Sequence, residues 1–184
     1  MTHPVLYHKQ QFAGELEVRG ERVPVQLSAQ LALSVNFSRE RLRPERKHRW
    51  AELDLRMLLP ESNLLHVGGH FTRKLLTRAA TELEGLVAGE GSTAHLVSID
   101  YGCNLRFDRI GGIDPRVAVS GEFDLWLQEV KLSRRWRKAL RQKRSTVRLD
   151  RLLIDRISVS KLSEMIREFL DAVGDGLREE SIFD

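Results

Sequence analysis

The chain has 184 residues, of which 41% are hydrophobic and 30% are charged. This length and mixture are typical of one folded domain with its own hydrophobic core, and they exclude a long disordered chain. The single cysteine, Cys103, excludes an internal disulfide and fits a reducing compartment. The first residues lack the pattern of a secretory signal, and no stretch reaches the ~18 apolar residues that a membrane-spanning helix needs. We therefore expect a cytoplasmic protein.

The net charge of +4 conceals an uneven distribution of charge along the chain. Residues 133–148, SRRWRKALRQKRSTVR, hold eight basic residues and no acid, and Lys131 lies just before them. Without these nine residues the chain has 21 basic and 26 acidic side chains. One segment therefore makes an otherwise slightly acidic protein basic, which bears on its partners rather than on its fold.

The first third of the chain has the period of two that is typical of strands with one buried face. Apolar residues alternate with polar ones around Leu16, and after a turn at Gly20 they occupy odd positions from Val23 to Phe37. A polar loop, 38–50, follows, and alternation then returns until Pro60. The segment NLLHVGGHF is expected to be a short strand or a loop.

The remainder alternates between helical and strand patterns. A helix is predicted over 72–88, with Thr72 at its start and Gly89 at its end. Strands are predicted over 94–101, 103–110, 116–127 and 146–157, with a short helix over 134–144. A last helix is expected to begin at Ser158 or Ser160 and to end at Gly174. We see no internal repeat.

These elements predict an α+β fold with a largely antiparallel sheet, two main amphipathic helices on one face and one short basic helix. A single domain is expected over 1–176, followed by a mobile tail over 177–184.

The basic segment admits three interpretations. Its cations can neutralise phosphates of a nucleic acid, with Trp136 stacking on an unpaired base. Alternatively, Trp136 and Leu140 pack on the sheet while the cations face water, or the cations contact an acidic protein partner. No known nucleic-acid-binding motif accompanies the segment. The candidate partner-binding residues are Arg134, Arg135, Trp136, Arg137, Lys138, Arg141, Lys143 and Arg144. The loop residues Arg39, Arg41, Arg43, Arg46 and Lys47 are candidates to extend this surface.

Catalytic patterns are weak. Asp124, Glu129 and Lys131 supply the residue types of an Mg²⁺-dependent nuclease, but the carboxylates are only five positions apart, which leaves no room for the turn that such a site needs. On a continuous strand Asp124 and Glu129 would point to opposite faces. We therefore expect no catalytic residues and no enzymatic activity.

The only possible metal ligands near one another in the sequence are His66, His70, His95, Asp100 and Cys103. Structural zinc sites have a denser framework of cysteine and histidine, so we predict no metal and no cofactor. We interpret Cys103 as a small buried residue rather than a nucleophile.

The order of elements in the second half resembles that of small bacterial toxin-immunity proteins of the WapI-associated type. The resemblance lies in the helix FTRKLLTRAATELEGLVAG, the strands LVSIDYGCNLRFD and VAVSGEFDLWL, and the late strand and helix VRLDRLLIDRISVSKLSEMIREFLDAV. It covers about 66–173 and departs from that family at the basic insert. It implies a non-catalytic bacterial protein that binds one partner tightly. Together with the charge pattern, this predicts a non-enzymatic binding protein with an acidic partner.

Overall fold

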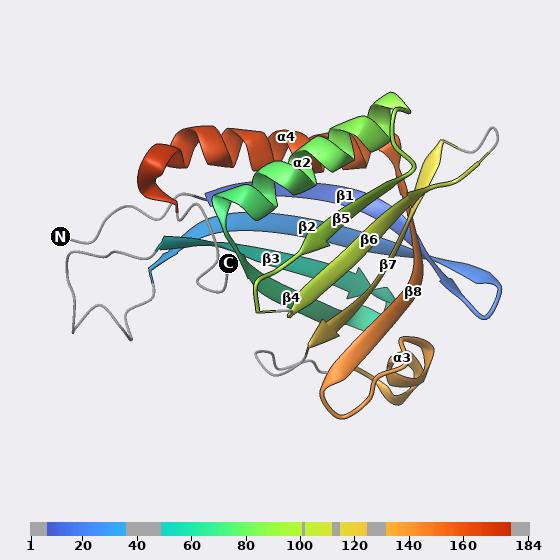
Figure 1. The fold of residues 1–184 in the computed structure, drawn as a ribbon. Coiled ribbons are helices and arrows are strands. Elements are labelled where there is room, and N and C mark those ends of the chain that lie inside the picture. The colour runs from blue at the N-terminus through green and yellow to red at the C-terminus, as the bar shows by residue number, and fades with distance from the viewer. Residues whose placement is uncertain (1–6, 36–48, 101, 112–114, 125–131, 178–184) are drawn as a thin grey trace.

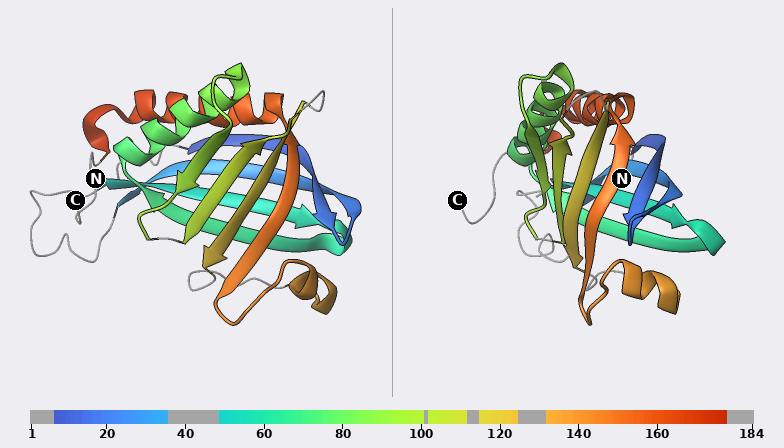
Figure 2. Two further views of the ribbon diagram at one scale, coloured as in Figure 1. Left: turned by 45° about the vertical axis from the view of Figure 1, so that its right-hand side comes forward. Right: turned by 90° about the vertical axis from the view of Figure 1, so that its right-hand side faces the viewer.

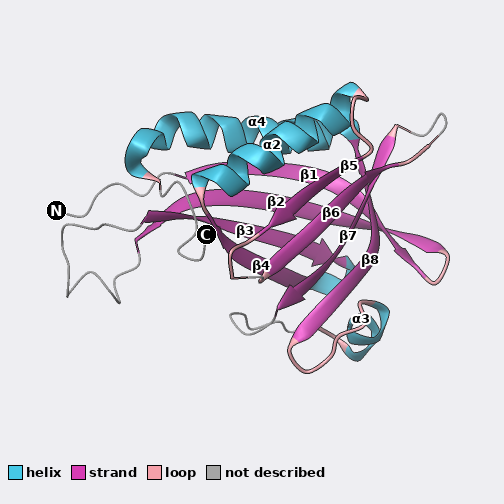
Figure 3. Ribbon diagram, in the orientation of Figure 1, coloured by secondary structure: helices cyan, strands magenta, loops and turns pink. Residues whose placement is uncertain are grey.

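The computed structural model describes residues 7–35, 49–100, 102–111, 115–124 and 132–177. It confirms the predicted α+β class (Figure 3). The strands are β1 Tyr7–Val18, β2 Glu21–Val35, β3 Arg49–Leu59, β4 Asn63–Phe71, β5 Thr93–Val97, β6 Cys103–Arg109, β7 Arg116–Asp124 and β8 Thr146–Asp155. The helices are α2 Arg73–Ala88, α3 Arg134–Ala139 and α4 Arg156–Val173, with short 3-10 turns η1 Pro60–Ser62 and η2 Gly174–Gly176.

All eight strands form one antiparallel sheet in the order β4-β3-β2-β1-β8-β7-β6-β5. The sheet is strongly curved, so that β1–β4 and β5–β8 face one another across the core, and α2 and α4 lie side by side over one side (Figure 1). The short helix α3 lies at the opposite end of the molecule (Figure 2).

The two halves of the sheet have the same organisation. Four strands are followed by a helix twice, as β1–β4 with α2 and as β5–β8 with α4, and α3 is inserted before β8. The helix of each half packs on the first strand of the other half, α2 on β5 and α4 on β1. The halves are joined at their centre by a short pairing of β1 with β8, from Gly14↔Ile154 to Leu16↔Leu152. Each half therefore depends on the other to cover its apolar surface.

The outer edges of the sheet approach each other where β4 meets the β5–β6 connection. The backbone N–H of Ile99 donates to the carbonyl of His70 at 2.9 Å. A Cβ at Gly69 would lie 2.7 Å from Cβ of Ser98, a contact that only glycine avoids. The Gly pair of this strand thus permits the close approach that curls the sheet.

Most helix ends lie where the sequence predicts them, with two differences. Thr72 caps α2 by accepting a hydrogen bond from the Leu75 amide at 3.3 Å, and Gly89 ends α2 with a left-handed φ of 85°. The predicted start of α4 was wrong, because Asp155 is the N-cap and its carboxylate accepts from the Ser158 amide at 2.6 Å. Helix α3 is shorter than predicted because Arg141 adopts a left-handed φ of 47°, which a helix cannot continue.

The boundary of the predicted tail also needs correction. Leu177 is 4% exposed and belongs to the hydrophobic core cluster, whereas the rest of the predicted tail, 178–184, lies outside the described residues. The domain therefore extends at least to Leu177.

Candidate functional site

The basic segment is tied to the rest of the fold at both ends of α3. Ser133 caps the helix, accepting from the Trp136 amide at 3.4 Å, and its own amide donates to Asn63 Oδ1 at 3.0 Å. At the other end the Leu140 carbonyl accepts from the Arg148 amide at 3.1 Å. The segment therefore has a defined place beside β4 and β8.

The apolar side chains of this segment are part of the core. Trp136 is 1% exposed and Leu140 is 2% exposed. The indole N–H of Trp136 has no hydrogen-bond partner among the described residues, and the Arg135 guanidinium lies 5.7 Å from the centroid of the ring. This corrects the interpretation of Trp136 as a residue that stacks on a base, because almost none of the ring is exposed.

The remaining candidates, Arg134, Arg135, Arg137, Lys138, Arg141, Lys143 and Arg144, are all exposed. Two of them are neutralised by neighbouring acids: Arg135 pairs with Glu61 at 3.1 Å, and Arg141 pairs with Asp150 at 3.0 Å. The other five of these seven candidates have no ion pair among the described residues. We call these five the basic face: Arg134, Arg137, Lys138, Lys143 and Arg144.

A groove runs between α3 and the β1–β2 turn. It consists of two hollows of about 480 and 290 Å³ that share Val18, Arg19, Lys138 and Ala139. The turn is a two-residue hairpin connection in which Arg19 and Gly20 both have positive φ, 52° and 82°. It holds Arg19 exposed at its tip, beside the helix. The turn was predictable from the sequence, but Arg19 was not a predicted site residue, because no local signal shows that the turn lies next to α3.

Several predicted residues lie outside the described part of the chain. They are Arg39, Arg41, Arg43, Arg46, Lys47, Glu129 and Lys131. Asp124 is half-buried at the end of β7.

The three histidines predicted as possible metal ligands each pair with a different carboxylate. His70 Nδ1 lies 2.8 Å from Asp100, His95 Nδ1 lies 3.2 Å from Glu82, and His66 pairs with Asp54. In the described ranges no group of three histidine, cysteine or acidic side chains is placed to hold a metal ion.

The pair of His70 and Asp100 fastens the seam between β4 and the β5–β6 connection. Burial alone would raise the pKa of Asp100, but hydrogen bonds from His70, Ser98 and the Gly102 amide hold it at about 2. The hydrogen bond to Asp100 raises the pKa of His70. The nearby Cys103 is buried, and burial together with the charge of Asp100 raises its thiol pKa to about 12. That value suits a packed side chain and not a thiolate nucleophile.

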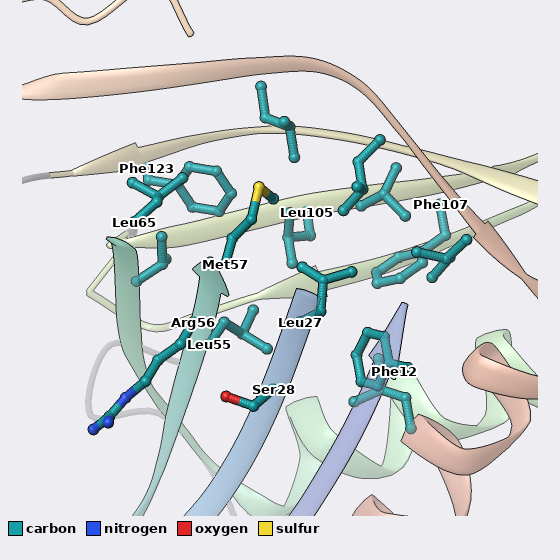
Figure 4. A pocket seen from close by; sticks show the side chains of 16 residues that line it. Phe12, Leu27, Ser28, Leu55, Arg56, Met57, Leu65, Leu105, Phe107 and Phe123 are labelled. Carbon is teal, nitrogen blue, oxygen red and sulfur yellow. The ribbon is translucent and has the colours of Figure 1, made fainter. Parts of the chain in front are cut away.

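The core between the two half-sheets contains an apolar cavity of about 60 Å³ (Figure 4). Phe12, Leu27 and Met57 face it from one half, and Leu105, Phe107 and Phe123 face it from the other. Space of this size holds only a few methyl-sized groups, far less than the ~300 Å³ at which typical ligand pockets begin. We therefore treat it as a packing feature of the core.

Comparisons of this chain with protein families, with curated proteins and with solved structures find no match. In the part of the chain that the structure describes, none of the helices has the length and apolar character required to span a bilayer.

Proposed function

We propose that this chain is a non-enzymatic, cytoplasmic binding protein whose basic face engages an acidic protein partner. The observation that carries this proposal is the combination of five exposed, unpaired cations with the buried Trp136 and Leu140 beneath them. Trp136 and Leu140 anchor α3 on the core, and this anchoring keeps the exposed cations together in one region of the surface. Complementary charge arranged in this way steers association and selects the partner.

The burial of Trp136 favours a protein over a single-stranded nucleic acid. Binding of unpaired bases relies on stacking against aromatic side chains, which contributes ~1–3 kcal/mol per base. The only aromatic residue of α3 is not available for that role. Carboxylates of a protein partner need only the guanidinium and ammonium groups, all of which are exposed.

The order of elements in the second half of the chain, which resembles that of toxin-immunity proteins, supports a similar role. Such a protein would act by capturing one partner tightly and would need no cofactor. Because immunity proteins against nucleases are often acidic, the basic face favours a partner of a different kind within that class.

The test reverses charge on the face and compares the variant with a matched control. Arg137→Glu with Lys138→Glu changes two exposed cations of the basic face, and Lys9→Glu with Lys161→Glu changes two exposed cations on β1 and α4. Both variants have the same net charge. Immobilised wild-type protein and both variants are used to capture partners from a cell lysate, which are identified by mass spectrometry and by the ratio of absorbance at 260 and 280 nm.

We expect an acidic protein to be captured by the wild type and by the Lys9/Lys161 variant, and to be lost from the Arg137/Lys138 variant at an unchanged thermal midpoint. Equal capture by all three proteins would contradict the proposal. Capture of nucleic acid instead, with an affinity that falls steeply with salt, would replace it with a nucleic-acid-binding function.

A further inference from the structure

We propose that the groove between α3 and the β1–β2 turn is the site where the acidic partner docks, and that it receives an extended peptide segment in which carboxylates alternate with small apolar side chains. This inference rests on the proposed function and assigns its site, residues and ligand chemistry. The site includes Arg19, a residue far from the basic segment in the sequence.

The charges along the groove leave a net positive surplus once existing ion pairs are counted. Its lining includes the cations Arg19, Arg134, Arg135, Lys138 and Arg141 and the acids Glu17, Glu21 and Asp150. Arg135 and Arg141 are engaged by Glu61 and Asp150, and Glu17 lies 3.6 Å from Arg151. Among the described residues, Arg19, Arg134 and Lys138 remain without an ion pair, opposed by Glu21. Carboxylates are the groups that these cations can bind.

The groove also has an apolar component. Val18 and Val23 line it from the hairpin, and Ala139 and the buried Trp136 line it from α3. Val18, Val23 and Ala139 are half-buried rather than covered. Small apolar side chains of a docking segment would cover them, while its carboxylates reach the cations at the rim. In an extended segment successive side chains point in opposite directions, so alternation of the two types would let one set contact the half-buried apolar lining and the other set the exposed cations.

Two of the four non-glycine residues with unfavourable backbone conformations in the described ranges line the groove. The non-glycine residues with positive φ in the described ranges are Arg19, Glu61, Ser62 and Arg141. Arg19 and Arg141 line the groove, and Glu61 pairs with Arg135. Arginine is not favoured in this region of φ, which suits Gly and Asn, and such conformations cluster at binding sites and active sites. An arginine held at the turn tip against its conformational preference is consistent with a binding role for its side chain.

The test measures binding of a fluorescein-labelled short peptide in which Glu and Val alternate, by fluorescence anisotropy. Arg19→Asn with Lys138→Gln removes two cations from the groove, and Asn is suited to the positive φ at position 19. Lys9→Gln with Lys161→Gln removes two exposed cations that belong neither to the basic face nor to the groove. A peptide with Gln in place of Glu and a labelled single-stranded DNA serve as the other probes, and thermal midpoints show that each variant is folded.

We expect the groove variant to bind the Glu–Val peptide at least about tenfold more weakly than the wild type, and the Lys9/Lys161 variant to stay within about threefold. The Gln peptide should not bind. Equal binding by these two variants would overturn the groove, while capture of an acidic partner that depends on Arg137 and Lys138 would leave the proposed function of the basic face intact. Absence of peptide binding by the wild type, or tighter binding of the DNA, would overturn the assignment of the ligand.

Discussion

Val117 and Val119 lie on the same inward-facing side of β7, but their surroundings differ. Val119 borders the apolar cavity of about 60 Å³, whereas Val117 is 0% exposed and does not line it. An empty volume in a core costs free energy because the side chains around it lose contacts, and a side chain that already fills its site cannot grow without strain. The two positions thus form a matched pair for testing the cavity.

Val119→Ile adds one methylene group into the cavity and should raise the free energy of unfolding by about 0.5–1 kcal/mol. Val117→Ile adds the same group where there is no space and should lower the free energy by about 1 kcal/mol or more. Both substitutions keep a β-branched side chain in the strand, so strand propensity does not separate them. Urea denaturation of both variants measures the difference, and a lower stability for Val119→Ile than for the wild type would show that the cavity cannot accept the group.

At the scale of elements, the seam between β4 and the β5–β6 connection depends on pH through His70 and Asp100. The pKa of His70 is raised, so its contribution to stability is complete below about 6.5 and is lost as pH rises through the folded-state value. The pKa of Asp100 is lowered to about 2, so its contribution is present above about 3.8 and is lost only as pH falls toward that value. The pair is therefore most stabilising between about pH 4 and pH 6.5.

We predict that His70→Gln destabilises the protein more at pH 5.5 than at pH 8.5. The difference should be about 0.5 kcal/mol, because both side chains are partly exposed and such pairs contribute modestly. Stability is measured by urea denaturation at each pH for the wild type, His70→Gln, Asp100→Asn and the double variant. A pH-independent effect of His70→Gln, or additive single effects in the double variant, would show that the two side chains are not coupled.

At the scale of the whole molecule, each half of the sheet depends on the helix of the other. Helix α2 packs on β5 and α4 packs on β1, and the halves share the short β1–β8 pairing. A half separated from its partner would expose both a sheet face and the apolar stripe of its own helix. Short amphipathic helices without tertiary contacts are marginal in water, so we expect neither half to fold alone.

This predicts the behaviour of a chain divided in the connection between α2 and β5, at Glu90 and Gly91. The fragments 1–90 and 91–184 should each lack a cooperative thermal transition by circular dichroism, and an equimolar mixture should regain one. The undivided protein is the control. A cooperative transition in either fragment alone would indicate that the halves are independent domains.

An element could be predicted from the sequence when local interactions fix it, and could not be when contacts between distant residues fix it. Strands β1–β3 and helix α2 were predictable because their apolar periods and the caps Thr72 and Gly89 are local features. The start of α4 was missed because Asp155, Ser158 and Ser160 are all suitable N-caps, and the choice depends on Ser158 being buried against the sheet. The repetition of four strands and a helix was not visible as a sequence repeat, since packing constrains apolar pattern and not residue identity.

The α+β class, the largely antiparallel sheet and the concentration of positive charge in one segment could be predicted from the sequence, because hydrophobic period, turn residues and charge are properties of neighbouring positions. The burial of Trp136, the pairing of Arg135 and Arg141 with Glu61 and Asp150, and the position of Arg19 beside α3 are seen only in the three-dimensional structure. These outcomes depend on segments separated by many residues that the curvature of the sheet brings together, and no local pattern records that curvature.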